Sequence, residues 1–214
     1  MQKGKIIVIE GIDQAGKGTQ SNLLQSNLLQ SGLLINALKF SGNVCTVMDF
    51  PDYTTPIGQE IRAFLDGKRN YTLETKHVLM SANRWEKKKE IESLIENGTI
   101  IIMNRYYQSN LVYGVSHGLN LKWLLNLDRG LPKEDVVIVL EVNPNTSYRR
   151  VPRDRDTLPR GRDTFEIDQK LLTKVHKNYR KLAKRFNWKI INGERVSGEV
   201  HNDIMKIVKK VLNA

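Results

Sequence analysis

The hydrophobic and polar positions of this chain fall into five short apolar runs, separated by longer stretches with helical spacing. The runs are rich in β-branched residues, a composition typical of buried strands in a parallel sheet. They predict strands at residues 6–10, 44–50, 99–103, 136–141 and 189–191, with amphipathic helices at 77–96, 165–185 and 198–212. Strands that alternate with helices form βαβ units, so we predict an α/β fold built on a parallel sheet flanked by helices.

A glycine-rich segment follows the first apolar run directly and reads Gly-Ile-Asp-Gln-Ala-Gly-Lys-Gly-Thr over residues 11–19. Its glycines allow a tight turn that brings backbone N–H groups close to phosphate oxygens, and its lysine can reach the β- and γ-phosphates. The following helix directs its positive dipole end at the same anion. The segment therefore predicts a nucleotide phosphate-binding loop. The residues assigned to ATP here are Gly11, Ile12, Asp13, Gln14, Ala15, Gly16, Lys17, Gly18, Thr19 and Gln20.

The hydroxyl residue of this loop is displaced by one position. The full pattern has Ser or Thr directly after the lysine, whereas here Gly18 follows Lys17 and the hydroxyl belongs to Thr19. The displacement leaves open which hydroxyl, if any, meets a Mg²⁺ ion. It leaves the cradle itself unchanged, because the cradle is mainly backbone.

Composition limits the classes of protein to which the chain can belong. Its 214 residues suit one domain over residues 1–214, and no apolar run approaches the roughly 20 residues of a membrane-spanning helix. The net charge of +11, from 34 Lys and Arg against 23 Asp and Glu, attracts polyanions. No groove-reading motif or zinc-finger spacing accompanies it, so we favour solvated helix faces over a nucleic-acid partner. The lone Cys45 excludes an intrachain disulfide and, with no visible signal peptide, favours a cytoplasmic protein.

An arginine-rich segment follows the fourth predicted strand. Its arginines are Arg149, Arg150, Arg153, Arg155, Arg160 and Arg162. Pro152 and Pro159 argue against one continuous helix in this stretch. We therefore predict a mobile, cationic loop.

Three further motifs accompany the loop. Phe50-Pro51-Asp52-Tyr53 ends the second strand, HVLMSANRWE spans residues 77–86, and Asn104-Arg105-Tyr106 ends the third strand, followed by Ser109 and Tyr113. Taken in order with the glycine-rich loop and the arginine-rich segment, these motifs resemble the thymidylate kinase family. The resemblance covers nearly the whole chain, from about residue 5 to residue 212.

This resemblance implies a P-loop NTPase fold with a five-stranded parallel sheet and an arginine-rich lid, at about residues 149–163, that closes over ATP. It implies an ATP-dependent phosphotransferase that converts dTMP to dTDP on the route to dTTP. Mg²⁺ would be bound together with ATP. A cytoplasmic homodimer, paired through helices that include part of residues 77–96, is implied as well.

The resemblance also assigns roles around the acceptor. Asp13 would face the acceptor sugar or a Mg²⁺-bound water, and Asp13 and Thr19 are the candidate metal ligands, directly or through water. Arg105 would bind the acceptor phosphate, because a guanidinium fork fits phosphate oxygens. Arg84 would reach the thymine O4 or the phosphate. The residues expected around the acceptor are Asp13, Phe50, Pro51, Tyr53, Met80, Asn83, Arg84, Asn104, Arg105, Ser109 and Tyr113.

Phosphoryl transfer depends mainly on alignment and on neutralisation of charge. The resemblance implies catalytic roles for Lys17, Asp13 and Arg105, joined by Arg153, Arg155 or Arg160 of the lid. The lid is expected to supply this last arginine because Gln14 occupies the loop position where some family members carry one. Arg150 would lie against the adenine ring.

Three positions depart from the family pattern. Asn104 stands where the family usually has aspartate, Met80 where an aromatic ring commonly stacks on thymine, and Tyr53 where some members have arginine. They leave open a related monophosphate kinase that accepts dUMP, AMP or UMP, or a noncatalytic nucleotide sensor. Structural ion pairs remain the alternative for Arg84 and Arg105, and a helix cap the alternative for Asn104.

Overall fold

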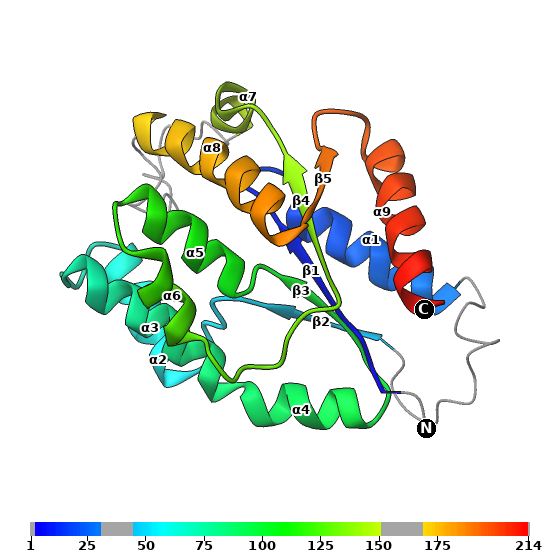
Figure 1. Ribbon diagram of the computed structural model, residues 1–214, viewed down its shortest axis with the longest axis horizontal. Helices are drawn as coiled ribbons and strands as arrows, with labels where there is room; N and C mark the ends of the chain where they lie inside the picture. Colours follow the sequence, from blue (N-terminus) through cyan, green and yellow to red (C-terminus); the bar gives the residue numbers. More distant parts are fainter. Residues whose placement is uncertain (1–2, 31–44, 151–168, 214) are drawn as a thin grey trace.

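Five parallel strands form the centre of the molecule in a computed structural model that describes residues 3–30, 45–150 and 169–213 (Figure 1). The strands are β1 (Ile6–Glu10), β2 (Cys45–Asp49), β3 (Ile100–Asn104), β4 (Val136–Glu141) and β5 (Lys189–Asn192). Their order in the sheet is β2-β3-β1-β4-β5, and every neighbouring pair is parallel. The predicted five-stranded parallel sheet is confirmed, and no strand end differs from its prediction by more than one residue.

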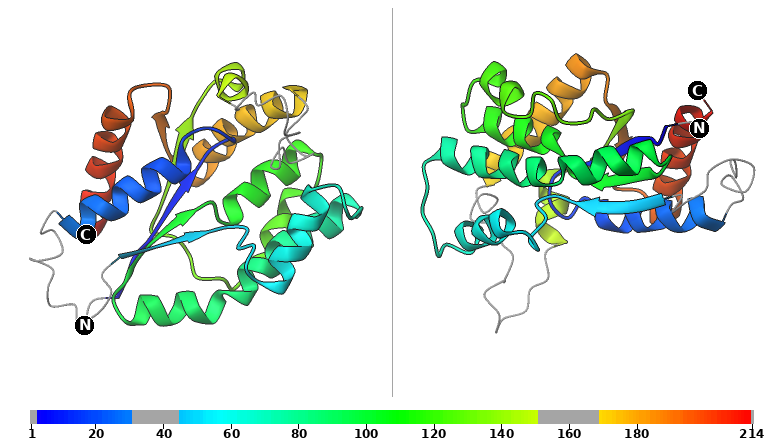
Figure 2. Two further views of the ribbon diagram at one scale, coloured as in Figure 1. Left: turned by 180° about the vertical axis from the view of Figure 1, so that it is seen from behind. Right: turned by 90° about the horizontal axis from the view of Figure 1, so that it is seen from below.

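Helices cover both faces of this sheet (Figure 2). One face carries α1 (Lys17–Gln30) and α9 (Ser197–Leu212), and the other carries α4 (Lys88–Glu96), α5 (Tyr107–Ser116) and α8 (Gln169–Phe186). A further group, α2 (Pro56–Leu65), α3 (Leu73–Glu86) and α6 (Leu121–Leu127), packs against α5, and α7 (Pro144–Arg149) follows β4. None of the helices in the described ranges is both long and apolar enough to cross a membrane.

Burial on both faces explains why the three central strands, β1, β3 and β4, appear as continuous apolar runs. Ile7, Val8 and Ile9 of β1 have no exposed surface. Since β1 lies between β3 and β4, its carboxyl end is flanked by those of both neighbours. The register pairs Ile9 with Asn104. The sheet thus brings the segment after β1 beside the segment after β3.

The helix predicted over residues 77–96 is two helices, and this prediction is wrong in its bounds. Thr72 caps the N-terminus of α3, its hydroxyl accepting a hydrogen bond from the Thr75 N–H, so the helix begins at Leu73. A break at Lys87 separates α3 from α4. The physical reason is that the two halves pack differently: α3 lies on α5 and α6, whereas α4 lies on β3.

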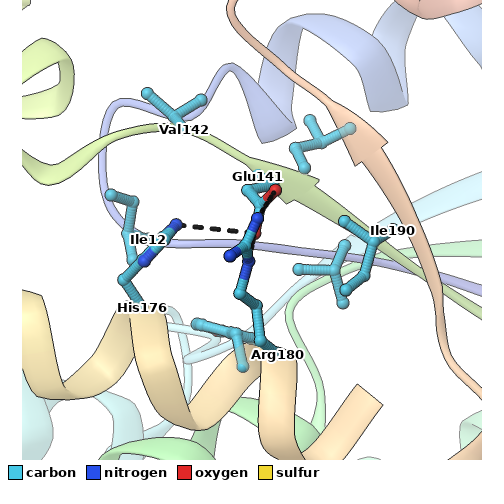
Figure 3. A pocket seen from close by; sticks show the side chains of 9 residues that line it. Ile12, Glu141, Val142, His176, Arg180 and Ile190 are labelled. Atoms are coloured by element: carbon cyan, nitrogen blue, oxygen red, sulfur yellow. Dashed lines mark hydrogen bonds and ion pairs between the residues drawn. The ribbon is translucent and has the colours of Figure 1, made fainter. Parts of the chain in front are cut away.

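The last residue of β4 fixes α8 to the sheet (Figure 3). The Glu141 carboxylate accepts hydrogen bonds of 2.5 and 3.1 Å from the Arg180 guanidinium and lies 3.5 Å from His176 Nε2. Ile12 and Ile190 close the apolar side of the small pocket around this cluster.

The predicted helix 165–185 corresponds to α8, and its first residues lie outside the described part of the chain.

Candidate active site

The glycine-rich loop adopts a backbone path that needs its glycines. Gly11 and Gly16 have φ values of 147° and 88°, which favour glycine. At Gly11 a Cβ atom would also come within 2.7 Å of the Leu140 carbonyl oxygen. The loop then leads into α1 at Lys17, so backbone N–H groups of the loop and the start of the helix meet at the carboxyl end of β1.

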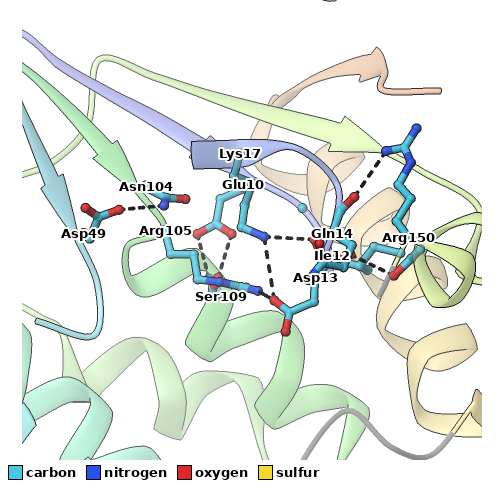
Figure 4. A network of polar contacts seen from close by, with 12 residues as sticks. Glu10, Ile12, Asp13, Gln14, Lys17, Asp49, Asn104, Arg105, Ser109 and Arg150 are labelled. Atoms are coloured by element: carbon cyan, nitrogen blue, oxygen red, sulfur yellow. Dashed lines mark hydrogen bonds and ion pairs between the residues drawn. The ribbon is translucent and has the colours of Figure 1, made fainter. Parts of the chain in front are cut away.

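The loop lysine turns back across the loop (Figure 4). Lys17 Nζ, on a side chain only 8% exposed, donates a hydrogen bond of 2.9 Å to the Ile12 carbonyl oxygen and lies 3.8 Å from Asp13 Oδ1. The Asp13 carboxylate also accepts a hydrogen bond from Arg105 Nη2. An ammonium, a carboxylate and a guanidinium therefore converge where the loop meets β3.

Arg105 is held on several sides. Its backbone has φ of 66°, in the left-handed region, and its N–H donates to the Ile9 carbonyl oxygen at 3.0 Å. A non-glycine residue in this region costs on the order of 1–3 kcal/mol, which the surroundings must offset. Arg105 Nη1 donates to Ser109 Oγ at 3.1 Å, and the guanidinium lies 5.7 Å from the centre of the Tyr113 ring. This arrangement keeps the guanidinium at the wall of the adjoining cavity.

That cavity, of about 550 Å³, opens beside Asp13 and Arg105. Its volume falls in the range of small-molecule sites. All the residues expected around the acceptor line it except Asn83. The predicted residues that line it are Asp13, Phe50, Pro51, Tyr53, Met80, Arg84, Asn104, Arg105, Ser109 and Tyr113.

Several lining residues were missed by the sequence reasoning. They are Asp49, Arg62, Leu65, Lys76, His77, Tyr106 and Asn110. Two signals could have found some of them. Thr55 followed by Pro56 is a helix-start pattern that predicts α2, which carries Arg62. His77 lies one turn before Met80, on the same face of α3.

Asn83 does not contact the cavity, which corrects its predicted role. It is fully buried, and its amide accepts from the Asp52 N–H at 2.8 Å while donating to the Asp52 carbonyl oxygen at 3.1 Å and to Thr55 Oγ1 at 2.8 Å. Asn83 therefore fixes the turn that follows Pro51. Its contribution to the site is the placement of that turn.

Arg84 both lines the cavity and forms a structural ion pair. Its side chain is buried, and Nε and Nη2 donate to the two carboxylate oxygens of Asp128 at 3.0 and 2.9 Å. Ser81 Oγ donates to the same carboxylate at 2.8 Å. The ion-pair alternative is thus correct for Arg84, and its Nη1 takes no part in either bond.

His77 presents a neutral ring to the cavity wall. Its Nδ1 lies 2.5 Å from Asn110 Oδ1, and because an amide oxygen only accepts, Nδ1 carries the hydrogen. Burial lowers the pKa of His77 to about 4. At neutral pH the ring therefore adds hydrogen-bonding groups to the cavity but no charge.

Asn104 pairs with the end of the neighbouring strand. Its Nδ2 donates to Asp49 Oδ1 at 2.6 Å, while its Oδ1 is buried and accepts no hydrogen bond within the described ranges. The alternative that Asn104 caps α5 is wrong. The N-cap residue of this helix is Tyr106, and the Asn104 side chain donates to Asp49 instead. A carboxylate is still present here, carried by Asp49 of β2 rather than by position 104.

Of the residues expected to bind ATP, Arg150 lies beside the loop, whereas the Gln20 side chain is directed away from it. Arg150 bridges the loop and the turn after β5, donating to the Gln14 and Gly193 carbonyl oxygens at 3.2 and 3.4 Å. The Gln20 side chain is directed to α9 instead, where Nε2 donates to the Ser197 carbonyl and hydroxyl oxygens, each at 3.0 Å. Arg153, Arg155 and Arg160, with most of the predicted lid, lie outside the described residues.

Comparison with known proteins gives a consistent result. A family model described as thymidylate kinase matches residues 9–204. The zebrafish thymidylate kinase is 34% identical, covering 99% of this chain and 93% of its own length, and that of Plasmodium falciparum is 37% identical, covering 98% and 92%. A solved structure of thymidylate kinase from Candida albicans superposes with a TM-score of 0.79 at 27% identity, covering 97% of this chain and 92% of its own.

Proposed function

Because this chain belongs to the thymidylate kinase family, we propose that it transfers the γ-phosphoryl group of ATP to dTMP, giving dTDP. The observation that carries the proposal is the convergence of Lys17, Asp13 and Arg105 between the glycine loop and the cavity. The loop would hold the donor phosphates, and the cavity would hold the acceptor nucleoside. Arg105 stands at their junction.

Contacts within the chain hold Lys17 and Arg105 in place at the loop. Lys17 Nζ donates to the Ile12 carbonyl oxygen, and Arg105 Nη2 donates to the Asp13 carboxylate. On nucleotide binding, Lys17 would exchange these contacts for β- and γ-phosphate oxygens, and Arg105 would turn its fork to the acceptor phosphate. The gain for catalysis is alignment of donor and acceptor and neutralisation of their charge.

A Mg²⁺ ion arriving with ATP fits this chain. Asp13 and Thr19 offer a carboxylate and a hydroxyl, and both are accessible at the loop. Mg²⁺ commonly takes one or two such protein ligands and completes its shell with phosphate oxygens and waters. Within the described ranges no cluster of three or more His, Cys, Asp or Glu residues could hold a metal by itself, so the nucleotide would supply most ligands. When bound, the ion neutralises and orients the phosphates.

The remaining parts of the proposal extend beyond the cavity. We assign the whole chain to one kinase domain in the cytoplasm, with a lid at about residues 149–163 that supplies Arg153, Arg155 or Arg160 to the transferring group and excludes water. Arg150 supports an adenine site between the loop and Gly193, because it already contacts both.

A homodimer through α3 is part of the same proposal. Val78 and Trp85 of α3 are 43% and 37% exposed and lie seven residues apart, so they share one face of the helix. A second copy of the chain would cover them.

The test is a coupled ADP-release assay with ATP and Mg²⁺ that compares dTMP, dUMP, dGMP, AMP, UMP and CMP at equal concentration. We expect clear preference for dTMP over the other acceptors. Preference for another monophosphate would keep the kinase and overturn the acceptor. ATP binding without turnover of any acceptor would instead support the nucleotide sensor.

A further inference from the structure

Glu10, the last residue of β1, is a fully buried carboxylate for which the sequence reasoning found no role. Its two oxygens accept four hydrogen bonds. The donors are the Tyr106 N–H at 3.0 Å, the Ser109 N–H at 3.1 Å, the Ser109 hydroxyl at 2.7 Å and the Tyr179 hydroxyl at 2.8 Å. Burial of a charge is costly unless such partners compensate it. Four donors from α8 and the start of α5 show that this position is built for a carboxylate.

The first task of Glu10 is to cap α5. That helix begins at Tyr107, and its N-cap residue, Tyr106, provides no side-chain cap. Glu10 Oε1 accepts from the N–H groups of Tyr106 and Ser109, two of the four donors that a helix N-terminus leaves unsatisfied. Its charge also lies at the positive end of the helix dipole. A residue of β1 thus fixes where α5 starts.

The second task follows from the geometry of Ser109. The Ser109 hydroxyl has one hydrogen, which it donates to Glu10 Oε2, so its lone pairs remain for the Arg105 Nη1 donor at 3.1 Å. Arg105 directly precedes the capped turn and has a left-handed backbone. Glu10 therefore acts on Arg105 twice, through the hydroxyl that holds its guanidinium and through the turn that holds its backbone (Figure 4).

We propose that Glu10 is a positioning residue for the acceptor phosphate: it orients the Arg105 guanidinium through Ser109 and the first turn of α5. This inference rests on the proposed function, since it takes Arg105 as the group that binds the dTMP phosphate. Tyr179 extends the connection to α8, because its hydroxyl donates to the same carboxylate. Burial raises the pKa of Tyr179 well above its usual value, which keeps this hydroxyl protonated as a donor.

The first test is Glu10→Gln, which keeps the shape of the side chain. In this variant an amide NH2 would stand where Glu10 Oε2 now accepts from Ser109 and Tyr179. The Ser109 hydroxyl hydrogen must then turn away, and the amide N–H competes with Arg105 Nη1 for the lone pairs of Ser109 Oγ. We expect the KM for dTMP to rise by about tenfold or more, with the KM for ATP within about twofold of wild type. Equal changes in both KM values, or none, would overturn the proposal.

A double-mutant cycle separates positioning from a merely structural role. The dissociation constant for dTMP is measured calorimetrically for the wild type, Glu10→Gln, Arg105→Ala and the double variant. If Glu10 acts through Arg105, Glu10→Gln changes the constant by less than about twofold once Arg105 is alanine. Additive effects of the two substitutions would contradict the proposal.

If Glu10→Gln folds poorly, Tyr179→Phe is the second test variant and Tyr107→Phe is its control, because each tyrosine hydroxyl donates to a carboxylate. Tyr179→Phe removes one donor to Glu10, whereas Tyr107→Phe removes a hydroxyl on α5 that donates to Glu134 at 2.7 Å. Both variants lose a tyrosine–carboxylate bond and should lower the melting temperature. Only Tyr179→Phe should raise the KM for dTMP, by about threefold; equal KM effects would overturn the proposal.

NMR of the Arg105 guanidinium nitrogens tests the positioning role of Glu10 independently of whether dTMP is the acceptor. The guanidinium signals of Arg105 are assigned by their loss in Arg105→Ala. We expect restricted rotation in the wild type and averaged signals in Glu10→Gln, with or without dTMP. Unchanged signals would overturn the positioning role even if dTMP is phosphorylated. Changed signals in a chain that does not phosphorylate dTMP would support the positioning and overturn only the proposed function.

Discussion

At the scale of single residues, the site depends on side chains whose partners are charged or buried. Asp13 joins Lys17 to Arg105, and Asp49 places a carboxylate beside Asn104. Asp13 and Lys17 are four residues apart in one loop, but the contacts of Asp13 with Arg105 and of Asp49 with Asn104 cannot be predicted from spacing, because they join the ends of different strands. The identity of the residues is visible in the sequence, whereas their partners depend on the register of the sheet.

Lys17→Ala and Arg105→Ala test the two sides of the junction. Lys17→Ala removes the ammonium that contacts the loop carbonyl of Ile12, so we expect kcat to fall by at least about a hundredfold, with the fold intact by circular dichroism. Arg105→Ala should raise the KM for dTMP by a similar factor while ATP binding is retained. Steady-state kinetics with varied ATP and varied dTMP measure both. Near-normal turnover of Lys17→Ala would refute its role at the phosphates.

The buried ring of His77 predicts a pH dependence of stability. Its pKa is about 4 in the folded protein and about 6.5 in an unfolded chain, so between these values the unfolded state binds a proton that the folded state does not. Stability from this group is present above pH 6.5 and is lost as the pH falls towards 4. Between pH 7 and pH 5 the loss amounts to about 2 kcal/mol.

The measurement is the free energy of urea unfolding at both pH values for the wild type and His77→Gln. The variant should lose less stability than the wild type. A matched control is His201→Gln, because burial also lowers the pKa of His201, but this ring lies on α9 and away from the cavity. Identical pH dependence of the wild type and His77→Gln would refute the assignment.

At the scale of elements, α3 acts as a clamp between the end of α6 and the turn at residues 52–55, which carries Tyr53 of the cavity wall. Ser81, Arg84 and Trp85 bind the end of α6, where the Trp85 indole donates to the Leu127 carbonyl oxygen at 2.9 Å. Asn83 and Glu86 bind the turn at residues 52–55 on the other side. Most of the SANRWE motif therefore joins α3 to its neighbours, while Arg84 also lines the cavity.

Asp128→Ala tests this clamp. It leaves Arg84 as a buried charge without its carboxylate, and we expect a loss of about 3–5 kcal/mol in the free energy of unfolding. Glu92→Ala is the control: it breaks the exposed pair with Lys88 on α4, and should cost about 0.5 kcal/mol or less. Chemical denaturation measures both. Equal losses would show that the buried pair is not what joins α3 to α6.

At the scale of the whole molecule, the sheet collects its chemistry at one edge. The loops after β1, β2 and β3 meet there, and the loop after β4 reaches the same place through α7, where Ser147 Oγ donates to the Asp13 carbonyl oxygen at 2.8 Å. Helix α3 lies on the side of the molecule opposite α9 (Figure 1), and it carries the exposed side chains of Val78 and Trp85.

Val78→Asp tests the proposed homodimer. The substitution places a charge in the centre of the α3 face, so we expect the dimer to dissociate, as measured by light scattering coupled to gel filtration. Val196→Asp is the control, because Val196 is 74% exposed but lies before α9. A wild-type monomer, or loss of the dimer in both variants, would contradict an interface through α3.

The sequence by itself determined the local parts of this protein. Apolar runs defined every strand within a residue. The signal was fullest for β1, β3 and β4, because strands buried on both faces must be apolar throughout. The loop could also be predicted from the sequence, because only glycine readily adopts the positive φ values found at Gly11 and Gly16. The acceptor residues taken from motif order line the cavity, except for Asn83, but they form only part of its wall, to which Arg62, Lys76 and His77 also belong.

Only the tertiary structure decided which of these residues face the cavity and which face each other. Helical spacing placed Asn83 and Arg84 together, yet one is directed to the turn after Pro51 and the other to Asp128. The carboxylate of Glu10 meets donors from residues 96, 99 and 169 positions later in the chain. Such contacts depend on how strands and helices pack across long separations, and no periodicity in a single chain records that packing.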